Sequence, residues 1–356
     1  MKLFNGGALR PATDSARLKA ANDLVQRTLA QHGLVSDAGL PGSGGLSAMD
    51  SILAGMTRPH MAGAAIQALP DGARFDQDTY TCPAGSRMHR TYVPASTRDG
   101  ATGVVMMLHG CTQTPEDFAA GTGMNVLAEQ LGFVVVYPAQ SRGDNAQSCW
   151  NWFSRGDQRR GRGEPAILAG LARQIASEHD IARDRSFVAG LSAGGAMAAI
   201  LGETYPDVFA AVGIHSGLPM GAAKDVSTAF AAMGGTILAG PARSNGGPTV
   251  RTIVFHGTSD ATVHPKNGER IVQRAIEADT VKLHETTEQG EDNGRSYERR
   301  IACDDAGADL VEYWTVEGQG HAWSGGSAKG SYTDSKGPDA SAEMVRFFFD
   351  RPKEVN

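Results

Sequence analysis

Short apolar runs recur along residues 73–350 of this 356-residue chain, and helical patterns separate them. The runs are as short as buried strands of a parallel sheet. They lie at residues 103–108, 133–138, 186–191, 210–215, 252–256 and 310–316. Apolar positions at helical spacing fall at residues 115–131, 164–179, 264–278 and 341–350. Strands alternating with helices predict an α/β domain over residues 73–356, with a mostly parallel central sheet flanked by helices.

The first 72 residues follow a different pattern. Leu18, Ala21, Val25 and Leu29 share one face of a predicted helix, and a glycine-rich linker follows at residues 41–45. No motif of known chemistry occurs there. We therefore expect residues 1–72 to form a helical, partly flexible N-terminal extension. After it, residues 75–82 and 88–93 have the pattern of an antiparallel hairpin.

Composition narrows the class of protein. The chain is 41% hydrophobic and 20% charged with a net charge of −6, which is ordinary for a soluble globular protein and gives no reason to expect nucleic-acid binding. No apolar run approaches the length of about 18 residues that a membrane-spanning helix needs. The first residues lack the apolar core of a signal peptide, so we expect a cytoplasmic protein, or a secreted one if a leader has been removed.

The cysteines do not follow a metal-binding pattern. Cys82, Cys111, Cys149 and Cys303 are scattered, and no Cys-x-x-Cys pair suits zinc. For an unexported chain, reduced thiols are the favoured state. No His-Glu-x-x-His motif or carboxylate cluster occurs either, so we expect neither a metal nor a cofactor.

The run Gly190-Leu191-Ser192-Ala193-Gly194 has the pattern of a nucleophile elbow, a serine on a sharp turn between a strand and a helix. Glycines at 190 and 194 allow the strand and the helix to approach closely. Ser192 is the predicted nucleophile, and the Ala193 N–H at the start of the helix is a predicted oxyanion donor. A similar string at residues 45–49 lacks both a preceding strand and the closing glycine.

An acid and a base follow in the expected order. Asp260 comes after the strand that ends at Phe255, and His321 comes after the strand that ends at Val316. Serine, acid, histidine is the chain order of α/β-hydrolase triads. The pattern leaves open Asp279, Asp304 and Asp305 as other acids, and His256, His264 and His284 as other bases.

The loop after residues 103–108 is the expected source of a second oxyanion donor. Either the Cys111 or the Thr112 N–H can serve, because Gly110 allows close approach of the backbone. Cys111 itself has no assigned base, so it is not favoured as a nucleophile. Four bulky side chains stand beside these loops, and we predict them as substrate-binding residues, with buried packing as the alternative for the tryptophans. They are His109, Trp150, Trp152 and Trp323.

Together these segments resemble the esterase family of polyhydroxybutyrate depolymerases, within the α/β-hydrolases. The resemblance covers roughly residues 75–350 and rests on residues 108–113, 149–153, 189–197, 256–260 and 320–326. It implies that Ser192, Asp260 and His321 form the triad and that Cys111 is the oxyanion-loop cysteine. If disulfides form, Cys111–Cys149 is the first expected pair, and Cys82–Cys303 is a possible second.

The resemblance implies a serine esterase that cleaves poly- or oligo-3-hydroxybutyrate esters through an acyl-enzyme. The alternatives are a feruloyl, acetyl or general short-chain esterase, and a non-catalytic binding protein on a hydrolase scaffold, against which the intact triad argues. Residues 1–72 do not resemble a polymer-binding module, which favours oligomers, amorphous granules or small esters over crystalline polymer. An ester substrate is the only partner expected, and the oligomeric state stays open.

Overall fold

The computed structural model describes residues 69–236, 250–279 and 282–350. The helix expected around Leu18 to Leu29, and with it nearly all of the expected extension, lies outside the described residues. The division at residue 72 therefore stays a prediction. Within the described residues, no helix combines the length and the apolar character that crossing a membrane requires.

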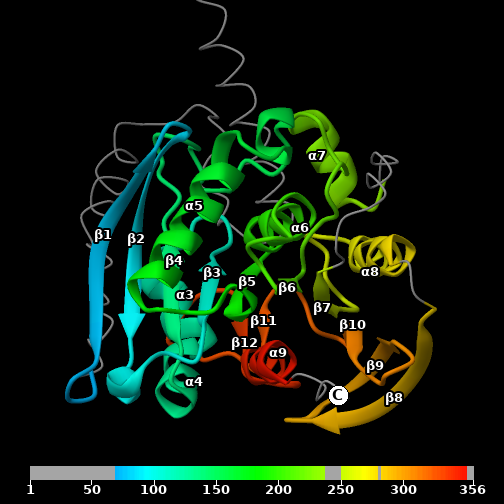
Figure 1. Ribbon diagram of the computed structural model, residues 1–356. Coiled ribbons are helices and arrows are strands. Elements are labelled where there is room, and N and C mark those ends of the chain that lie inside the picture. Colours follow the sequence, from blue (N-terminus) through cyan, green and yellow to red (C-terminus); the bar gives the residue numbers. More distant parts are fainter. Residues whose placement is uncertain (1–68, 237–249, 280–281, 351–356) are drawn as a thin grey trace, which may run out of the picture. The chain divides into compact units, whose positions relative to one another are not determined.

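A ten-stranded sheet forms the centre of the described structure, in the order β1-β2-β4-β3-β5-β6-β7-β10-β9-β8 (Figure 1). The six strands from β4 to β10 in this order pair in parallel, as predicted, and an antiparallel hairpin closes each edge. The strand bounds are β1 Arg74–Cys82, β2 Gly85–Val93, β3 Val104–Leu108, β4 Val134–Pro138, β5 Ser186–Leu191, β6 Ala211–His215, β7 Arg251–Gly257, β8 His284–Asp292, β9 Arg295–Cys303 and β10 Asp309–Val316. A separate short pair joins β11 (Trp323–Ser324) to β12 (Thr333–Asp334).

Helices cover both faces of the sheet. Side chains of β3 alternate between the faces: Val104 and Met106 pack with helices α5, α6 and α8, whereas Val105 and Met107 pack with α3, α4 and α9. The helix bounds are α3 Pro115–Thr122, α4 Met124–Leu131, α5 Gly163–Glu178, α6 Ala193–Thr204, α7 Val226–Met233, α8 Lys266–Ala278 and α9 Ala340–Phe349. Two apolar cores therefore lie on opposite sides of the sheet.

Some elements differ from the prediction. The single helix expected over residues 115–131 is two helices, because Gly123 adopts a left-handed conformation with φ 66° and ends α3. The sequence predicted no helix or strand between residues 217 and 250, whereas the structure has α7 there. The sequence predicted no element between residues 279 and 309, whereas the structure has the β8–β9 hairpin there.

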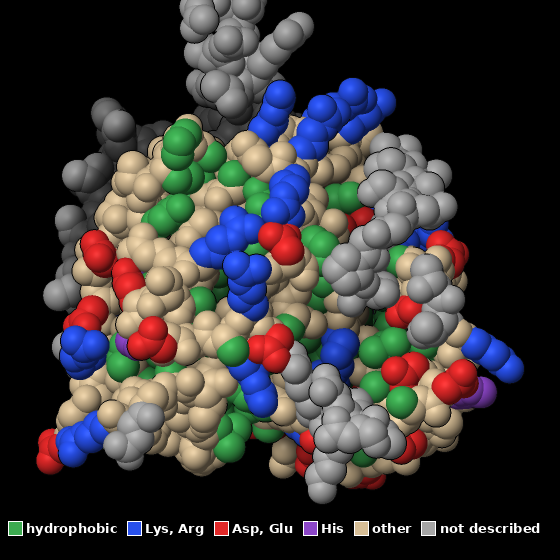
Figure 2. Space-filling view, in the orientation of Figure 1, with side chains coloured by type: hydrophobic (Ala, Val, Ile, Leu, Met, Phe, Trp, Pro, Cys, Tyr) green, Lys and Arg blue, Asp and Glu red, His purple; other side chains and the backbone are tan. Residues whose placement is uncertain are grey.

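The surface lacks a broad exposed group of large apolar side chains within the described residues. There the exposed large hydrophobic side chains are Leu69, Val126 and Leu131. On the face drawn in Figure 2, hydrophobic side chains lie in small separate groups among charged and other residues.

Candidate active site

Ser192 lies on a sharp turn between β5 and α6. Its backbone has φ 57° and ψ −118°, an uncommon conformation for a residue with a side chain. A Cβ atom at Gly190 would collide with the backbone of Gly194, and one at Gly194 would collide with the carbonyl of Leu108. The two glycines are therefore required by the close approach of β5, α6 and β3, as the sequence pattern indicated.

Asp260 and His321 meet at the carboxyl end of the parallel strands. The Nδ1 atom of His321 lies 2.7 Å from Oδ2 of Asp260. The other carboxylate oxygen accepts hydrogen bonds from the backbone N–H groups of Thr262 (2.9 Å) and Val263 (2.8 Å). Because Nδ1–H donates to the carboxylate, Nε2 of His321 keeps its lone pair and can accept a proton.

The charge on Asp260 is favoured by its partners. Burial alone would raise the pKa of this carboxyl, but the hydrogen bond from His321 and the nearby imidazoles outweigh it and lower the pKa to about 2. Asp260 is therefore ionised across the neutral range. A fixed carboxylate at Nδ1 holds the tautomer of His321 and stabilises its protonated form.

His215 connects the elbow to the segment that carries His321. Its carbonyl oxygen accepts the Ser192 N–H (2.9 Å), and its Nε2 accepts the N–H of Ser324 (3.0 Å). Ser324 follows His321 by three residues. A buried residue at the end of β6 thus joins two parts of the site that lie far apart in the sequence.

Neither His256 nor His284 offers a better base. His256 is fully buried, and its Nε2–H faces the carbonyl oxygen of Val263 (2.7 Å) and Oδ2 of Asp260 (3.5 Å). Burial lowers the pKa of His256. His284 lies on the edge strand β8 and contacts Asp305 at 2.8 Å, so both of these residues belong to the edge of the sheet.

The loop after β3 presents the Cys111 N–H. The Thr112 N–H donates to the carbonyl of Gln147 (2.8 Å), so of the two donors left open by the sequence it is already engaged. The Gly110 N–H donates to Oε1 of Gln113 (2.9 Å). Within the described part of the chain, the Cys111 N–H has no hydrogen-bond acceptor, which leaves it available to a ligand.

His109 orients this loop from the buried side. Its Nδ1–H donates to the Gly110 carbonyl (2.7 Å), and its Nε2 accepts the Gln140 N–H (3.1 Å). Burial lowers the pKa of His109 to about 4, so the ring is neutral. In a trans peptide C=O and N–H point in opposite directions, so holding the Gly110 carbonyl also fixes the direction of the Cys111 N–H.

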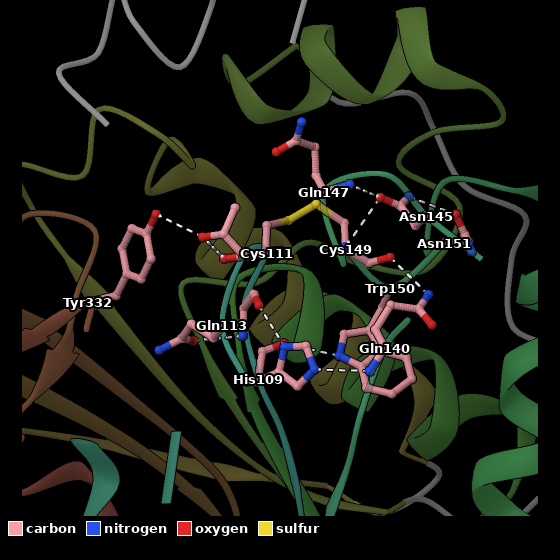
Figure 3. The surroundings of a disulfide bond; sticks show 12 residues. His109, Cys111, Gln113, Gln140, Asn145, Gln147, Cys149, Trp150, Asn151 and Tyr332 are labelled. Carbon is pink, nitrogen blue, oxygen red and sulfur yellow. Dashed lines mark hydrogen bonds between the residues drawn. A yellow bond between two sulfur atoms is a disulfide. The ribbon is translucent and has the colours of Figure 1, made fainter. Parts of the chain in front are cut away.

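A disulfide joins Cys111 to Cys149, with an S–S distance of 2.00 Å (Figure 3). This confirms the first expected pair and corrects the expectation that these two thiols are reduced. The second expected pair is wrong, because Cys82 and Cys303 are free. Cys82 ends β1 at one edge of the sheet, whereas Cys303 ends β9 near the opposite edge.

The structure supports the packing alternative for the tryptophans and gives His109 an internal role as well. Trp150 and Trp323 have no exposed surface, Trp152 is 6% exposed and His109 is 1% exposed. The indole of Trp150 donates to the His109 carbonyl (3.0 Å), and that of Trp323 donates to Oγ of Ser341 (3.0 Å). These side chains support the loops from inside, which corrects their expected role as substrate contacts.

A buried carboxyl group behind the disulfide was missed by the sequence analysis. Glu164 accepts hydrogen bonds from the backbone N–H (2.7 Å) and the side-chain amide (2.9 Å) of Asn151, and from the amide of Gln140. Arg87 lies 3.7 Å away. Burial nevertheless raises the pKa of Glu164 to about 7. Glu164 is part of a helical pattern in the sequence, and nothing there marks it as the anchor of residues 149–153.

Gln113 was also missed, although it stands in one of the segments that carry the family resemblance. Its amide accepts from the Gly110 N–H and donates to Asp117 (3.0 Å) and to the Ser331 carbonyl (3.0 Å). It therefore connects the loop after β3 to a segment more than two hundred residues later. Its place in that segment, three residues after Gly110, was the signal that could have identified it.

Comparison with solved structures supports the fold. An acetyl xylan esterase from Aspergillus awamori superposes with a TM-score of 0.61 at 20% identity, over 77% of this chain and 100% of that one. An S-formylglutathione hydrolase from Agrobacterium tumefaciens superposes with a TM-score of 0.50 at 15% identity, over 80% and 98%. The described domain has the α/β-hydrolase fold.

Comparison with known sequences identifies the family. Poly(3-hydroxyalkanoate) depolymerase C of Paucimonas lemoignei is 32% identical over 251 residues, 68% of this chain and 59% of that protein. Acetylxylan esterase A of Talaromyces purpureogenus is 29% identical over 192 residues, 49% of each. The chain thus spans about half to three fifths of these relatives. The family model described as "Esterase PHB depolymerase" matches residues 88–282, more than half of the chain, and the chain therefore belongs to that family.

Proposed function

We propose that this protein is a serine hydrolase of carboxylic esters, with Ser192 as nucleophile, His321 as general base and Asp260 as the acid that orients it. The observation that carries the proposal is the 2.7 Å contact between His321 and Asp260. It lies at the carboxyl ends of the parallel strands, where the Ser192 elbow also lies. The esterases and depolymerases among the relatives support the same reaction class.

The reaction follows from these roles. His321 Nε2 takes the proton of Ser192 Oγ as that oxygen attacks the ester carbonyl carbon. The carbon–oxygen bond to the alcohol then breaks, and His321 returns the proton to the departing oxygen. A water molecule attacks the acyl-enzyme in the same way, releasing the carboxylic acid and restoring Ser192.

The N–H groups of Ala193 and Cys111 are the proposed oxyanion donors. Ala193 is the first residue of α6, so its N–H has no partner within the helix, and the helix dipole favours negative charge there. The Cys111 N–H is held by His109 and the disulfide. Donors fixed before the reaction stabilise the charge of the tetrahedral intermediate without reorganising.

Esters of 3-hydroxybutyrate are the proposed substrates. The relative from Paucimonas lemoignei, which is named as a poly(3-hydroxyalkanoate) depolymerase, supports this choice. Within the described residues few large apolar side chains are exposed, which favours oligomers over crystalline polymer. Acetyl esters are the second candidate, supported by the acetylxylan esterases among the relatives.

The disulfide bears on where the protein works. Disulfides persist in oxidising compartments and are rare in the cytosol. Cys111–Cys149 therefore favours the secreted alternative over the cytoplasmic one. Mass spectrometry of the protein taken from its own cells, with free thiols blocked before lysis, checks this: a fully reduced Cys111 and Cys149 would favour the cytoplasm.

Product analysis with soluble 3-hydroxybutyrate oligomers tests the function. We expect wild-type protein to release monomer and dimer, and Ser192→Ala to lose at least about 10⁴-fold in kcat with the fold kept, because the nucleophile is gone. Circular dichroism checks the fold, and a fluorophosphonate probe should label wild type only.

Two outcomes would change the proposal. Ser192-dependent cleavage of p-nitrophenyl acetate or acetylated xylan without cleavage of the oligomers would keep the mechanism and move the substrate to acetyl esters. Failure of Ser192 to react with the probe would instead favour a non-catalytic protein on this scaffold.

A further inference from the structure

The segment that follows His321 turns back toward residues 109–113, the loop after β3 that carries the proposed donor Cys111 and is called the oxyanion loop below. Trp323, two residues after His321, donates its backbone N–H to the carbonyl of Tyr332 (2.8 Å). The short pair β11–β12 continues this contact, with Trp323 opposite Thr333. Tyr332 is therefore held beside the segment of the proposed base by backbone bonds.

The side chain of Tyr332 reaches the other half of the site. Its hydroxyl lies 3.2 Å from Oγ1 of Thr112, in an exposed contact. Figure 3 shows Tyr332 pointing toward the loop that carries Cys111. Thr112 directly follows Cys111, whose N–H is a proposed oxyanion donor. The phenol ring is half-buried and packs against the apolar core on the α3 and α9 side of the sheet. Tyr332 thus presents a polar tip on an anchored ring.

The backbone around Tyr332 is strained and tied down. Tyr332 has φ 52°, a left-handed conformation that is uncommon for a bulky residue. The preceding residue, Ser331, donates its N–H to Asp117 (2.9 Å) and accepts from Gln113 (3.0 Å) through its carbonyl. These contacts hold the strained conformation and fix the direction in which the phenol leaves the chain.

The position of Tyr332 suits a contact with the alcohol portion of an ester substrate. The oxyanion donors hold the carbonyl oxygen of the ester, and the base must reach the oxygen of the departing alcohol to return the proton. Tyr332 joins the segment after His321 to the oxyanion loop. An ester with its carbonyl oxygen at the oxyanion donors and its leaving oxygen toward His321 would place the first atoms of its alcohol portion between these two segments.

We propose that Tyr332 is a specificity-determining residue that contacts the alcohol portion of the ester and selects alcohols carrying a hydrogen-bond acceptor, such as the carbonyl or carboxylate of a hydroxy acid. The inference rests on the proposed ester hydrolysis and deepens it. It assigns the preference for hydroxy-acid esters to a contact on the leaving-group side.

The present partner of the Tyr332 hydroxyl is easy to exchange. Thr112 Oγ1 donates its own hydrogen to the Cys111 carbonyl (2.6 Å), so in the contact with Tyr332 it accepts. At 3.2 Å this contact is longer than the usual 2.5–3.0 Å range of O–H···O bonds. The phenol can therefore donate its hydrogen bond to a substrate carbonyl instead of to Thr112, with little loss of binding free energy.

Two substrates that share an acyl group test the proposal. Ethyl 3-hydroxybutanoate and the linear dimer of 3-hydroxybutanoic acid have the same acyl part, but only the dimer has a carboxylate on the alcohol part. We expect Tyr332→Phe to lower kcat/KM for the dimer about fivefold, the loss of one hydrogen bond, and to change the ethyl ester less than about twofold. Tyr297→Phe, on the β8–β9 hairpin, is the matched control and should leave both values unchanged.

A second variant separates a substrate contact from support of the loop. Thr112→Val removes the partner of the Tyr332 hydroxyl but leaves the phenol, so the dimer-to-ethyl ratio should stay within about twofold of wild type. In Tyr332→Phe, an equal loss on both substrates would mean that Tyr332 acts through the oxyanion loop and would overturn the proposal. Wild-type kcat/KM values for both substrates in Tyr332→Phe would overturn it as well.

The same assay separates this inference from the proposed function. Wild-type protein that cleaves neither ester, with no labelling of Ser192, would overturn ester hydrolysis itself. Ser192-dependent cleavage of both esters with a wild-type ratio in Tyr332→Phe would overturn only the role of Tyr332.

Discussion

The two halves of the candidate site are held in different ways. The acid is fixed by its own loop, because Asp260 accepts from the N–H groups of residues two and three positions later. The oxyanion loop is fixed from far away: Cys111 is bonded to a cysteine 38 residues on, and Gln113 to Ser331, 218 residues on. The orientation of the Asp260 carboxylate follows from local contacts, whereas that of the oxyanion loop exists only once distant segments have packed. A change to a supporting contact should therefore affect the two halves differently.

The largest effect should come from the acid itself. Asp260→Asn should lower kcat about 10³- to 10⁴-fold, because an amide at Nδ1 of His321 favours the wrong tautomer and cannot stabilise the imidazolium. Steady-state kinetics on a soluble ester at neutral pH measure this. Asp305→Asn, an exposed carboxylate that contacts His284 at the sheet edge, is the control and should change kcat less than about twofold. A similar loss in both variants would remove Asp260 from its proposed role.

The next largest effect concerns the free energy of unfolding and comes from Glu164, the buried carboxyl group behind the disulfide. Burial raises the pKa of Glu164 from 4.5 to about 7, so between these values the native state binds a proton that the unfolded state has released. The free energy of unfolding contributed by this group therefore falls as pH rises through that window. The difference in unfolding free energy between wild type and Glu164→Gln should decrease by about 3 kcal/mol between pH 4 and pH 8.

Urea unfolding at several pH values measures that difference. Glu178→Gln, at the exposed far end of α5, is the matched control and should keep the wild-type pH dependence. A Glu164→Gln variant whose stability runs parallel to wild type at every pH would show that folding does not raise the pKa of this carboxyl.

The smallest effect should come from opening the disulfide. Cys149→Ser should lower kcat about tenfold, because the Cys111 N–H is less well fixed but still present, and losing an oxyanion donor altogether costs about 10²- to 10³-fold. Cys82→Ser, which removes a free thiol on the edge strand β1, should leave kcat unchanged. Mild reduction of wild type should reproduce the Cys149→Ser rate. Full activity after verified reduction would mean that the packed contacts alone fix the loop.

The sequence was most informative where one local pattern determines the structure. The apolar runs before Gly110 and Ser192 predicted buried strands, and the glycines around Ser192 predicted the elbow. The β8–β9 hairpin could not be assigned, because β8 is polar on both faces and so shows no alternation. The burial of Trp150 and Trp323 was equally hidden, since it depends on segments far from them in the chain.

The cysteines illustrate the same limit. The resemblance indicated Cys111 and Cys149 because both stand in shared segments. Cys82 and Cys303 were paired only because they remained, and the strand order places them on opposite sides of the sheet. The roles of Glu164, Gln113 and Tyr332 required coordinates, because each acts on residues that no spacing rule connects to it.

The outermost strand β8 also affects how these molecules behave toward one another. An edge strand offers unpaired backbone groups to any passing strand and is a common starting point for aggregation. In β8 the side chains are exposed or nearly so, and acidic residues recur along it at Glu285, Glu288, Glu291 and Asp292. Two copies that approach through this edge bring like charges together. The polarity that hid this strand from prediction therefore also disfavours pairing of two molecules through this edge.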